Sequence, residues 1–377
     1  MGQMSLTLVA GPANAGKVAL LLERYLAALD RRPLLIVPNR SDVERVEREL
    51  LRRDPCLLGG WIGTFDDLFE EIAHGGDRKR VLPDSQRALL LRRTIAAASL
   101  NGLGASARFS GFADALADAI RDLEGGLVEP SDHDGRLAEL HSAYRAELER
   151  RGLWDRDLQR RHAADRIASE LGAWDGRPVF AYGFEDLTAA QWRLLEALAG
   201  RAEVAVSFPY EPGRAAFAAL ERTANDLARL AAEQETMPPR YAEVAHPALA
   251  HLERTLFADA TPPGPPALEG AVRWLEGAGR RGTAELVGEE ILSLLRAGTA
   301  VEEILVVCPG LERWRAPLET AFSTLGIPYA LEGRLRLGQT PFGTNAPPVI
   351  AAQPSRRPYA TTGSVISGGG GAQRTRP

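Results

Sequence analysis

The chain has 377 residues, of which 45% are apolar and 25% charged, as in ordinary globular proteins. This composition excludes a collagen, a coiled coil and a largely disordered chain, and no apolar run approaches the roughly 20 residues of a membrane helix. The net charge of −5 excludes a basic nucleic-acid binder, so any DNA contact must be local. No basic segment precedes the first apolar stretch, and we therefore expect a cytoplasmic protein without a membrane partner.

The residues that most often bind metals are few and poorly spaced. Cys56 and Cys308 lie far apart, with no Cys-x-x-Cys or Cys/His pattern, so we expect buried, inert thiols and no disulfide. His246 and His251 are five residues apart, a spacing that does not align two ligands on a helix, and we interpret them as surface or capping residues. No metal site is predicted.

The first part of the chain alternates short apolar runs with amphipathic segments. Each run is followed by Leu, Val or Phe at helical spacing. The predicted strands are 6–9, 34–37 and 61–63, and the predicted helices cover 17–29 and begin near Ser41 and at Thr64. Ser41 and Glu44 fit a capping box. Three strand–helix units in this order predict a parallel α/β sheet.

Strand signals stop between Pro83 and Trp174, and we interpret residues 83–174 as a helical insertion. Its predicted helices are 85–98, 112–124, 137–151 and 158–171. The α/β pattern resumes with strands 179–182 and 203–208, and with helices 188–198, near 215–235 and 247–257. Residues 1–82 and 175–257 are therefore predicted to form one sheet domain.

The remainder divides into three segments. Residues 258–270 are rich in proline and predict a stiff linker. Strands at 272–275, 304–307 and 327–330, with helices over 283–296 and 318–325, predict the beginning of a second α/β unit over 271–343. Residues 344–377 have four arginines, no acid and no apolar periodicity, so we expect a disordered tail. A frameshift or a false stop would explain the abrupt change of composition at this point. The alternative is a flexible linker whose arginines help to hold DNA.

One motif carries a specific chemistry. The sequence from Gly11 to Val18 is Gly-Pro-Ala-Asn-Ala-Gly-Lys-Val and matches the P-loop pattern Gly-x4-Gly-Lys, in which backbone N–H groups and the lysine hold phosphates. The predicted residues of a weak ATP site are Gly11, Asn14, Ala15, Gly16, Lys17 and Val18. Val18 replaces the hydroxyl that ligates Mg²⁺, which makes the metal doubtful. The alternative is a glycine-rich turn without a ligand.

The second half of an NTPase site is a strand that ends in acidic residues, and the candidate is 178–191. This segment resembles the DEFQD-T-N-x-x-Q motif of UvrD-like helicases, with matches at Phe184, Glu185, Asp186 and Gln191. Tyr182 and Gly183 then replace the Asp and Glu, as in a degenerate Walker B motif. This substitution is similar to the AddB-type subunit of bacterial helicase-nucleases. Segments 34–38, 63–68, 280–329 and 337–343 resemble that family in the same order.

The resemblance covers about residues 5–343 and implies a P-loop NTPase of RecA-like fold with a helical insertion, plus an incomplete second RecA-like unit. It implies a role in processing double-strand DNA ends for recombinational repair, with DNA and an AddA-type subunit as partners. Family members are much longer and carry a C-terminal PD-(D/E)XK nuclease and an iron-sulfur cluster. This chain has only two cysteines and no nuclease motif, so we expect neither the iron-sulfur cluster nor the nuclease in it.

We therefore expect a truncated AddB-like scaffold that binds nucleotide and DNA without hydrolysing ATP. The alternatives are an active helicase motor and an unrelated P-loop enzyme such as a kinase, which the acid-free strand end disfavours. The predicted DNA contacts are Thr64 and Phe65, from the family's Thr-Phe-x-x-Leu segment, and the loop residues Arg78, Lys79 and Arg80. Arginine pairs such as 52–53, 92–93, 150–151 and 160–161 are expected on solvated helix faces, from which they could still touch phosphates.

Overall fold

In the computed structural model, residues 6–76, 79–100, 102–258, 264 and 266–331 are described. The chain divides into two compact units, with the boundary between Ala271 and Val272, and each unit is described by itself. Arg78, residues 259–263 and 265 of the proline-rich segment, residues 332–343 of the predicted second α/β unit and the predicted tail lie outside the described residues. Within the described part, no helix is both long and apolar enough to cross a membrane.

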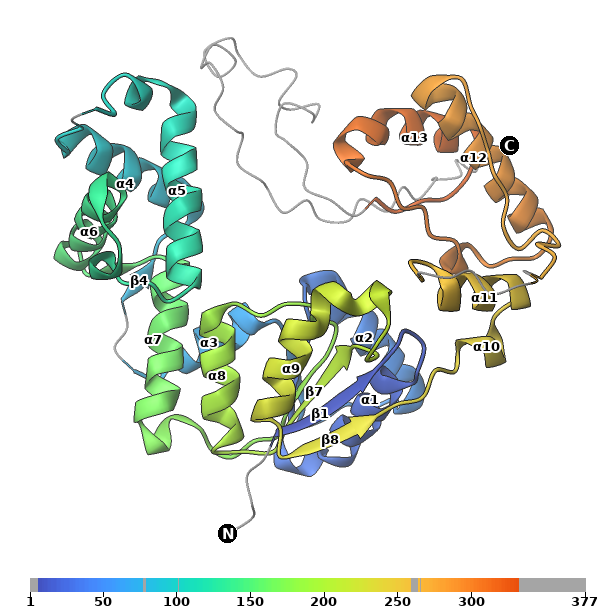
Figure 1. Ribbon diagram of the computed structural model, residues 1–377, viewed down its shortest axis with the longest axis horizontal. Coiled ribbons are helices and arrows are strands. Elements are labelled where there is room, and N and C mark those ends of the chain that lie inside the picture. Colours follow the sequence, from blue (N-terminus) through green and yellow to red (C-terminus); the bar gives the residue numbers. More distant parts are fainter. Residues whose placement is uncertain (1–5, 77–78, 101, 259–263, 265, 332–377) are drawn as a thin grey trace, which may run out of the picture. The chain divides into compact units, whose positions relative to one another are not determined.

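The first unit is built on a six-stranded parallel sheet (Figure 1). Its strands are β1 (Leu6–Gly11), β2 (Leu34–Ile36), β3 (Trp61–Gly63), β6 (Val179–Ala181), β7 (Val204–Pro209) and β8 (Glu233–Thr236). Their order in the sheet is β3-β2-β6-β7-β1-β8. The prediction of a parallel α/β sheet is confirmed.

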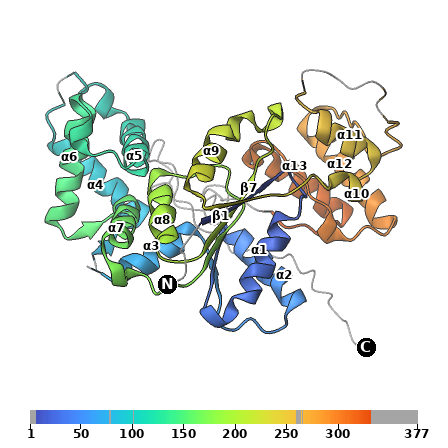
Figure 2. The same ribbon diagram turned by 60° about the horizontal axis from the view of Figure 1, so that its bottom comes forward.

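Helices cover both faces of this sheet. The helices α1 (Lys17–Ala27) and α2 (Arg40–Arg53) lie on one face, where their side chains pack on Val9 and Phe180. The other face, with Leu8 and Val206, is covered by α3 (Phe65–His74), α7 (Arg156–Ser169), α8 (Ala189–Ala199) and α9 (Glu221–Leu230). Figure 2 shows α1 and α2 on the opposite side of β1 and β7 from α8 and α9. Central strands buried on both faces explain the continuous apolar runs in the sequence.

Capping side chains set the start of several helices. Thr64 caps α3 in a reciprocal box with Asp67, as predicted for this threonine. The capping box expected at Ser41 and Glu44 is wrong. Asn39 caps α2 instead, because its side-chain oxygen accepts the Asp42 N–H at 3.0 Å, two residues before the predicted start.

The strand β8 corrects the helix predicted near 215–235. Residues 215–220 form a 3₁₀ helix and α9 follows, but Glu233–Thr236 pair with β1 as an edge strand. Three of these four polar residues are exposed, so no apolar pattern marked the strand. Backbone hydrogen bonding to β1 therefore decides its structure. After it come α10 (Tyr241–Val244) and α11 (Pro247–Thr255).

The helical segment 83–174 contains the four predicted helices, which are α4 (Asp84–Ala97), α5 (Ser110–Gly125), α6 (Gly135–Arg150) and α7. The prediction that this segment has no strand is wrong. β4 (Arg80–Val81) pairs in parallel with β5 (Leu153–Trp154) in a separate two-stranded sheet. Arg80, predicted in a loop, consequently lies in a strand. A pairing two residues long leaves no periodicity in the sequence.

The described part of the second unit contains the predicted helices, α12 (Gly279–Arg296) and α13 (Leu311–Leu325), which pack through Ile291 and Phe322. The strands predicted at 272–275, 304–307 and 327–330 are wrong, because no strand is assigned there. Apolar runs become strands only with hydrogen-bonded neighbours, and within the described residues these runs have none.

The prediction of two buried thiols is wrong. Cys56 is exposed, whereas Cys308 is partly buried. Cys56 lies just beyond α2, in the segment that leads to β3. Its exposure follows from this position on a connecting segment, because such segments run over the surface of the protein.

Candidate nucleotide-binding site

The carboxyl ends of β1, β6 and β7 lie at one edge of the sheet, where ligands bind in open α/β folds. β7 lies between β1 and β6 and pairs with both. The loop after β1 contains the Gly-x4-Gly-Lys motif, and the loop after β6 contains residues 182–188. The sheet therefore brings the two halves of the sequence-predicted site to the same edge.

The loop after β1 turns sharply into α1. Asn14 and Gly16 both have left-handed backbone angles, with φ of 57° and 92°. Among the described residues, no side chain caps the first turn of α1. Backbone N–H groups at this helix start are consequently available to an anion, and the helix dipole favours negative charge there.

Lys17 is turned back against its own loop. Its side chain is buried, with 8% of the residue exposed, and Nζ donates a hydrogen bond to the carbonyl oxygen of Pro12. Burial lowers the pKa of Lys17 to about 8. The ammonium group is thus still mostly protonated at neutral pH, and it must leave the Pro12 carbonyl to reach a phosphate.

Met237, which sequence reasoning missed, lies against both glycines of the motif. Its N–H donates to the Ala10 carbonyl at 2.7 Å, directly after β8. A Cβ on Gly11 would lie 2.8 Å from the Met237 carbonyl oxygen, and one on Gly16 would lie 3.6 Å from the Met237 methyl group. Gly11 is therefore required by the close approach of another segment of backbone. No sequence pattern marks Met237, because the strand before it is polar.

The loop after β6 lacks the acidic residues that end the corresponding strand of an active NTPase, and Tyr182 and Gly183 stand in their place. Tyr182 is buried, and this burial raises the pKa of its phenol. Gly183 has a φ of 84°, and a Cβ there would lie 2.9 Å from a ring carbon of Pro38. A larger residue at position 183 would therefore need a strained backbone and would clash with Pro38 in the loop that follows β2.

Among the polar residues that follow, Asp186, Thr188 and Gln191 form hydrogen bonds with residues close to them in the sequence. Glu185 and Asp186 are exposed, and an Asp186 carboxylate oxygen accepts the Leu187 N–H at 2.8 Å. The Gln191 amide oxygen accepts the Thr188 N–H at 2.8 Å, while Thr188 Oγ1 accepts the Gln191 N–H. Gln191 is thus the second half of the capping box that begins α8.

The residues at this edge do not fit a magnesium ion. Val18 is 40% exposed and carries no oxygen, and Tyr182 and Gly183 occupy the expected acidic positions. Across the described ranges, no group of three or more His, Cys, Asp and Glu residues is arranged to hold a metal ion.

The predicted DNA contacts are dispersed. Thr64 is engaged in its helix cap, and Phe65 is only 3% exposed, with its ring centroid 4.9 Å from that of Phe184. Lys79 pairs with Glu149 at 2.7 Å. Arg80 is exposed and donates to the Gln86 side chain at 3.0 Å. DNA binding by these residues stays a prediction.

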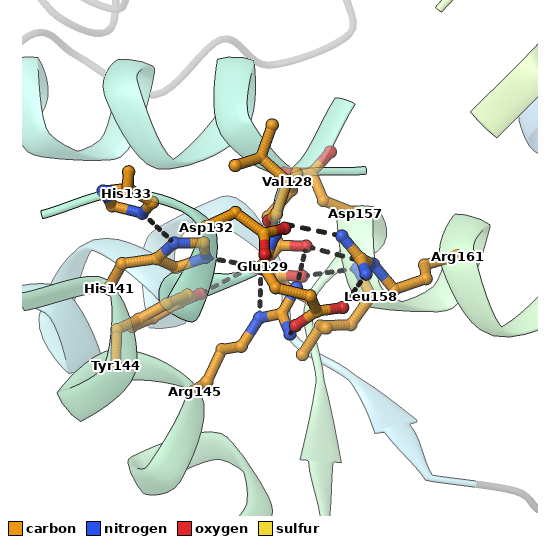
Figure 3. Close-up of polar contacts among 12 residues, drawn as sticks. Val128, Glu129, Asp132, His133, His141, Tyr144, Arg145, Asp157, Leu158 and Arg161 are labelled. Atoms are coloured by element: carbon orange, nitrogen blue, oxygen red, sulfur yellow. Dashed lines mark hydrogen bonds and ion pairs between the residues drawn. The ribbon is translucent and has the colours of Figure 1, made fainter. Parts of the chain in front are cut away.

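Sequence reasoning also missed a buried ionic cluster in the helical segment (Figure 3). Glu124 on α5 is 2% exposed and His141 on α6 is fully buried, and His141 Nε2 lies 2.7 Å from the Glu124 carboxylate. Arg145 donates to both Glu124 oxygens, at 2.5 and 2.7 Å. Arg145 and Arg161 both pair with Glu129. The cluster therefore joins α5, α6, α7 and the loop that contains Glu129.

Opposite forces act on the Glu124 carboxyl. Burial by itself would raise its pKa, but hydrogen bonds and charges from His141 and Arg145 outweigh burial and lower the pKa to about 2. Glu124 is therefore an anion at every physiological pH. Because a carboxylate only accepts hydrogen bonds, His141 Nε2 must carry the proton of the contact between them.

A second ionic cluster is buried at Arg87, Asp155 and Asp157 and reaches the surface at Asp66. Arg87 on α4 pairs with Asp155 and Asp157 at 3.4 and 3.3 Å. Arg160 on α7 donates to Asp157 at 2.9 Å and also to both oxygens of Asp66, at 2.7 and 2.8 Å. Asp66 lies in the first turn of α3, which covers the sheet. Arg160 and Asp157 are three residues apart on α7, but sequence spacing gave no sign of the pairs with Arg87 and Asp66, because these residues lie on other helices.

No protein-family model matches the chain. Three curated proteins are similar to it, and each is named as the B subunit of an ATP-dependent helicase/deoxyribonuclease. The protein from Desulforudis audaxviator is 28% identical over 87% of this chain and 32% of its own length. Those from Pelotomaculum thermopropionicum and Symbiobacterium thermophilum are 24% and 27% identical, over 87% and 81% of this chain. These similarities confirm the resemblance to B subunits of helicase-nucleases. The chain spans about a third of the length of the curated relatives that it matches.

Proposed function

We propose that this chain is the nucleotide-binding and DNA-contacting scaffold of a helicase/deoxyribonuclease of the AddB type. It would take part in processing double-strand DNA ends for recombinational repair, beside a second helicase-nuclease subunit of AddA type. One observation carries the proposal: a Gly-x4-Gly-Lys loop joins β1 to α1 at the carboxyl edge of a parallel sheet, in a chain similar to proteins with that name.

The proposed nucleotide site consists of the loop 11–18. A bound nucleotide supplies phosphate charge that the backbone N–H groups of this loop and Lys17 would neutralise. The strand order supports a RecA-like interpretation, since β7 separates the loop-bearing strand from the strand that ends at Tyr182. Lys17 would exchange its bond to the Pro12 carbonyl for one to a phosphate, and a charge-assisted bond of that kind is the stronger of the two.

We further propose that the site does not hydrolyse ATP. The transition state of phosphoryl transfer is stabilised almost wholly by positioned charges and a metal ion. Val18, Tyr182 and Gly183 supply none of the three oxygen ligands or bases expected around that metal. Hydrolysis is therefore expected to be slower by orders of magnitude than in a working motor, while phosphate binding persists.

Titration with a fluorescent ATP analogue, with and without Mg²⁺, tests this function. Wild-type protein should bind, with little dependence on the metal, and Lys17→Ala should weaken binding roughly 10- to 100-fold by removing a charged hydrogen bond. Lys79→Ala is a matched control, because it removes the other lysine of the chain, which pairs with Glu149 away from the loop. Phosphate release should stay at background with and without single-stranded DNA.

Two results would contradict this proposal. ATP hydrolysis that single-stranded DNA stimulates and Lys17→Ala abolishes would establish an active motor. A complete lack of nucleotide binding would establish a glycine-rich turn without a ligand.

A further inference from the structure

A surface hollow of about 300 Å³ lies between α4 and α6, away from the proposed nucleotide site. The two helices pack side by side (Figures 1 and 2). Three alanines and Thr94 leave the space open, and Arg93, Glu147, Arg150 and Arg151 surround it. The Thr94 hydroxyl is already bonded to the Leu90 carbonyl, so the charged groups decide what the hollow can bind.

The hollow has one carboxylate and three guanidinium groups. Glu147 accepts hydrogen bonds from Arg150 and Arg151, the latter at 2.6 Å. The hydrogen bond from Arg151 and the charges of Arg150 and Arg93 lower the pKa of Glu147, so it stays ionised. Two positive charges therefore remain in excess beside the hollow. The side chains of Arg150 and Arg151 are 68% and 39% exposed, within reach of a ligand.

A second site in the same unit shows what is unusual here. On α2, Glu49 pairs with Arg52 and Arg53 at the same sequence spacing as Glu147 with Arg150 and Arg151. That arrangement is the expected ion pairing of a solvated helix end. The end of α6 has the same ion pairs, but a third arginine, Arg93, reaches it from the neighbouring helix α4, and a hollow lies between the two helices.

Other basic residues lie near the same end of α6. Lys79 pairs with Glu149, one residue before Arg150. Arg80 pairs in register with Leu153, shortly after that helix. Because Glu149 neutralises Lys79, Arg80 is the group that extends the positive surface from the hollow along β4, and this suits a ligand with several phosphates in a row better than a single one.

We propose that Arg93 and Arg150 bind a backbone phosphate of DNA in the hollow between α4 and α6. The inference rests on the proposed DNA-contacting function and names a site for it. Guanidinium groups match the oxygens of a phosphate in bidentate geometry, and the contact reads no base sequence. Arg151 keeps Glu147 neutralised while the other two arginines hold the phosphate.

The test is a salt titration of DNA affinity with the full chain. The variant Arg93→Ala/Arg150→Ala leaves Glu147 paired with Arg151, and Arg48→Ala/Arg52→Ala is its matched control, because Arg53 likewise stays with Glu49. Fluorescence anisotropy with a duplex that carries a single-stranded tail should show a roughly 10-fold loss for the first variant and a logarithmic salt slope lower by about 1 to 2. The control should change less than twofold.

Other results would overturn either the DNA site alone or the proposed function itself. Wild-type protein that binds no DNA at low salt overturns the proposed function itself. Equal losses in both double variants, or no loss in the first, overturn the site and leave the function standing. A phosphoserine peptide that binds through Arg93 and Arg150, with DNA affinity unchanged, assigns the hollow to a protein partner and also overturns the DNA site. Arg93→Gln/Arg150→Gln provides the same test if the alanine variant misfolds.

Discussion

The interior of the six-stranded sheet is almost entirely apolar, whereas the interior of the helical segment 83–174 holds ionised groups. Among the described residues, the buried polar side chains of the sheet and its loops are Thr7, Lys17 and Ser207. Those of the helical segment are Arg87, Thr94, Glu124, His141, Asp155 and Asp157. The two regions of one compact unit therefore reach their packing by different chemistry.

The difference follows from what fixes each region. In the sheet, backbone hydrogen bonds set the register of every strand, and side chains need only fill space. In the helical segment, helices satisfy their own backbone, so side chains must set how one helix lies on the next. Glu124 joins α5 to α6 through His141 and Arg145, and Arg87 joins α4 to α7 through Asp157. Buried charges have a directional role there that the sheet does not require.

The largest expected effect comes from breaking the buried cluster. Glu124→Gln leaves Glu129 as the one carboxylate that pairs with Arg145 and Arg161, and removing one partner of a buried ion pair typically costs about 3–5 kcal/mol of unfolding free energy. Glu139→Gln is the control, because Glu139 pairs with Arg136 at the surface and exposed pairs contribute about 0–1 kcal/mol. Urea unfolding followed by circular dichroism measures both. Equal losses would show that the cluster has no special role.

Acid should act on the same cluster. The pKa of Glu124 is about 2 in the folded protein and lies near its ordinary value of about 4.3 when unfolded, so the folded state binds fewer protons between these pH values. Its contribution, about 3 kcal/mol, is complete above the unfolded pKa and falls as the pH falls, with about half lost by pH 3. Unfolding free energies from pH 6 to pH 3 should therefore decline more steeply in wild type than in Glu124→Gln. Parallel curves would refute this.

A stabilising substitution is expected at Lys17, the one charged group among the buried polar side chains of the sheet and its loops. Burial lowers the pKa of Lys17 to about 8, so the folded state binds fewer protons than the unfolded one between about pH 8 and pH 10.4, and stability rises with pH there. Lys17→Met should stabilise the protein by about 3 kcal/mol at pH 7, with a gain that disappears above pH 10.4. Thermal unfolding measures this gain. If Lys79→Met gives the same gain, burial of Lys17 is not its cause.

The proposed nucleotide site was only partly accessible from the sequence. The Gly-x4-Gly-Lys motif is local, so its strand, loop and helix could be predicted from neighbouring residues alone. The packing of Met237 on Gly11 and the bond from Lys17 to the Pro12 carbonyl could not, because both depend on how the loop is enclosed. Gln191 was recognised as a motif residue, but its bond to Thr188 makes it a helix cap.

The sequence by itself determined the strands β1, β2, β3, β6 and β7 and the helices α1 to α8 of the first unit, because apolar periodicity and capping residues such as Thr64 act within a few residues. Only the tertiary structure decided that polar Glu233–Thr236 form a strand and that apolar 304–307 do not. It also decided the partners of Glu124. The physical reason is the same in each case. A strand needs a hydrogen-bonded neighbour and a buried charge needs a counter-charge, and both partners come from distant parts of the chain.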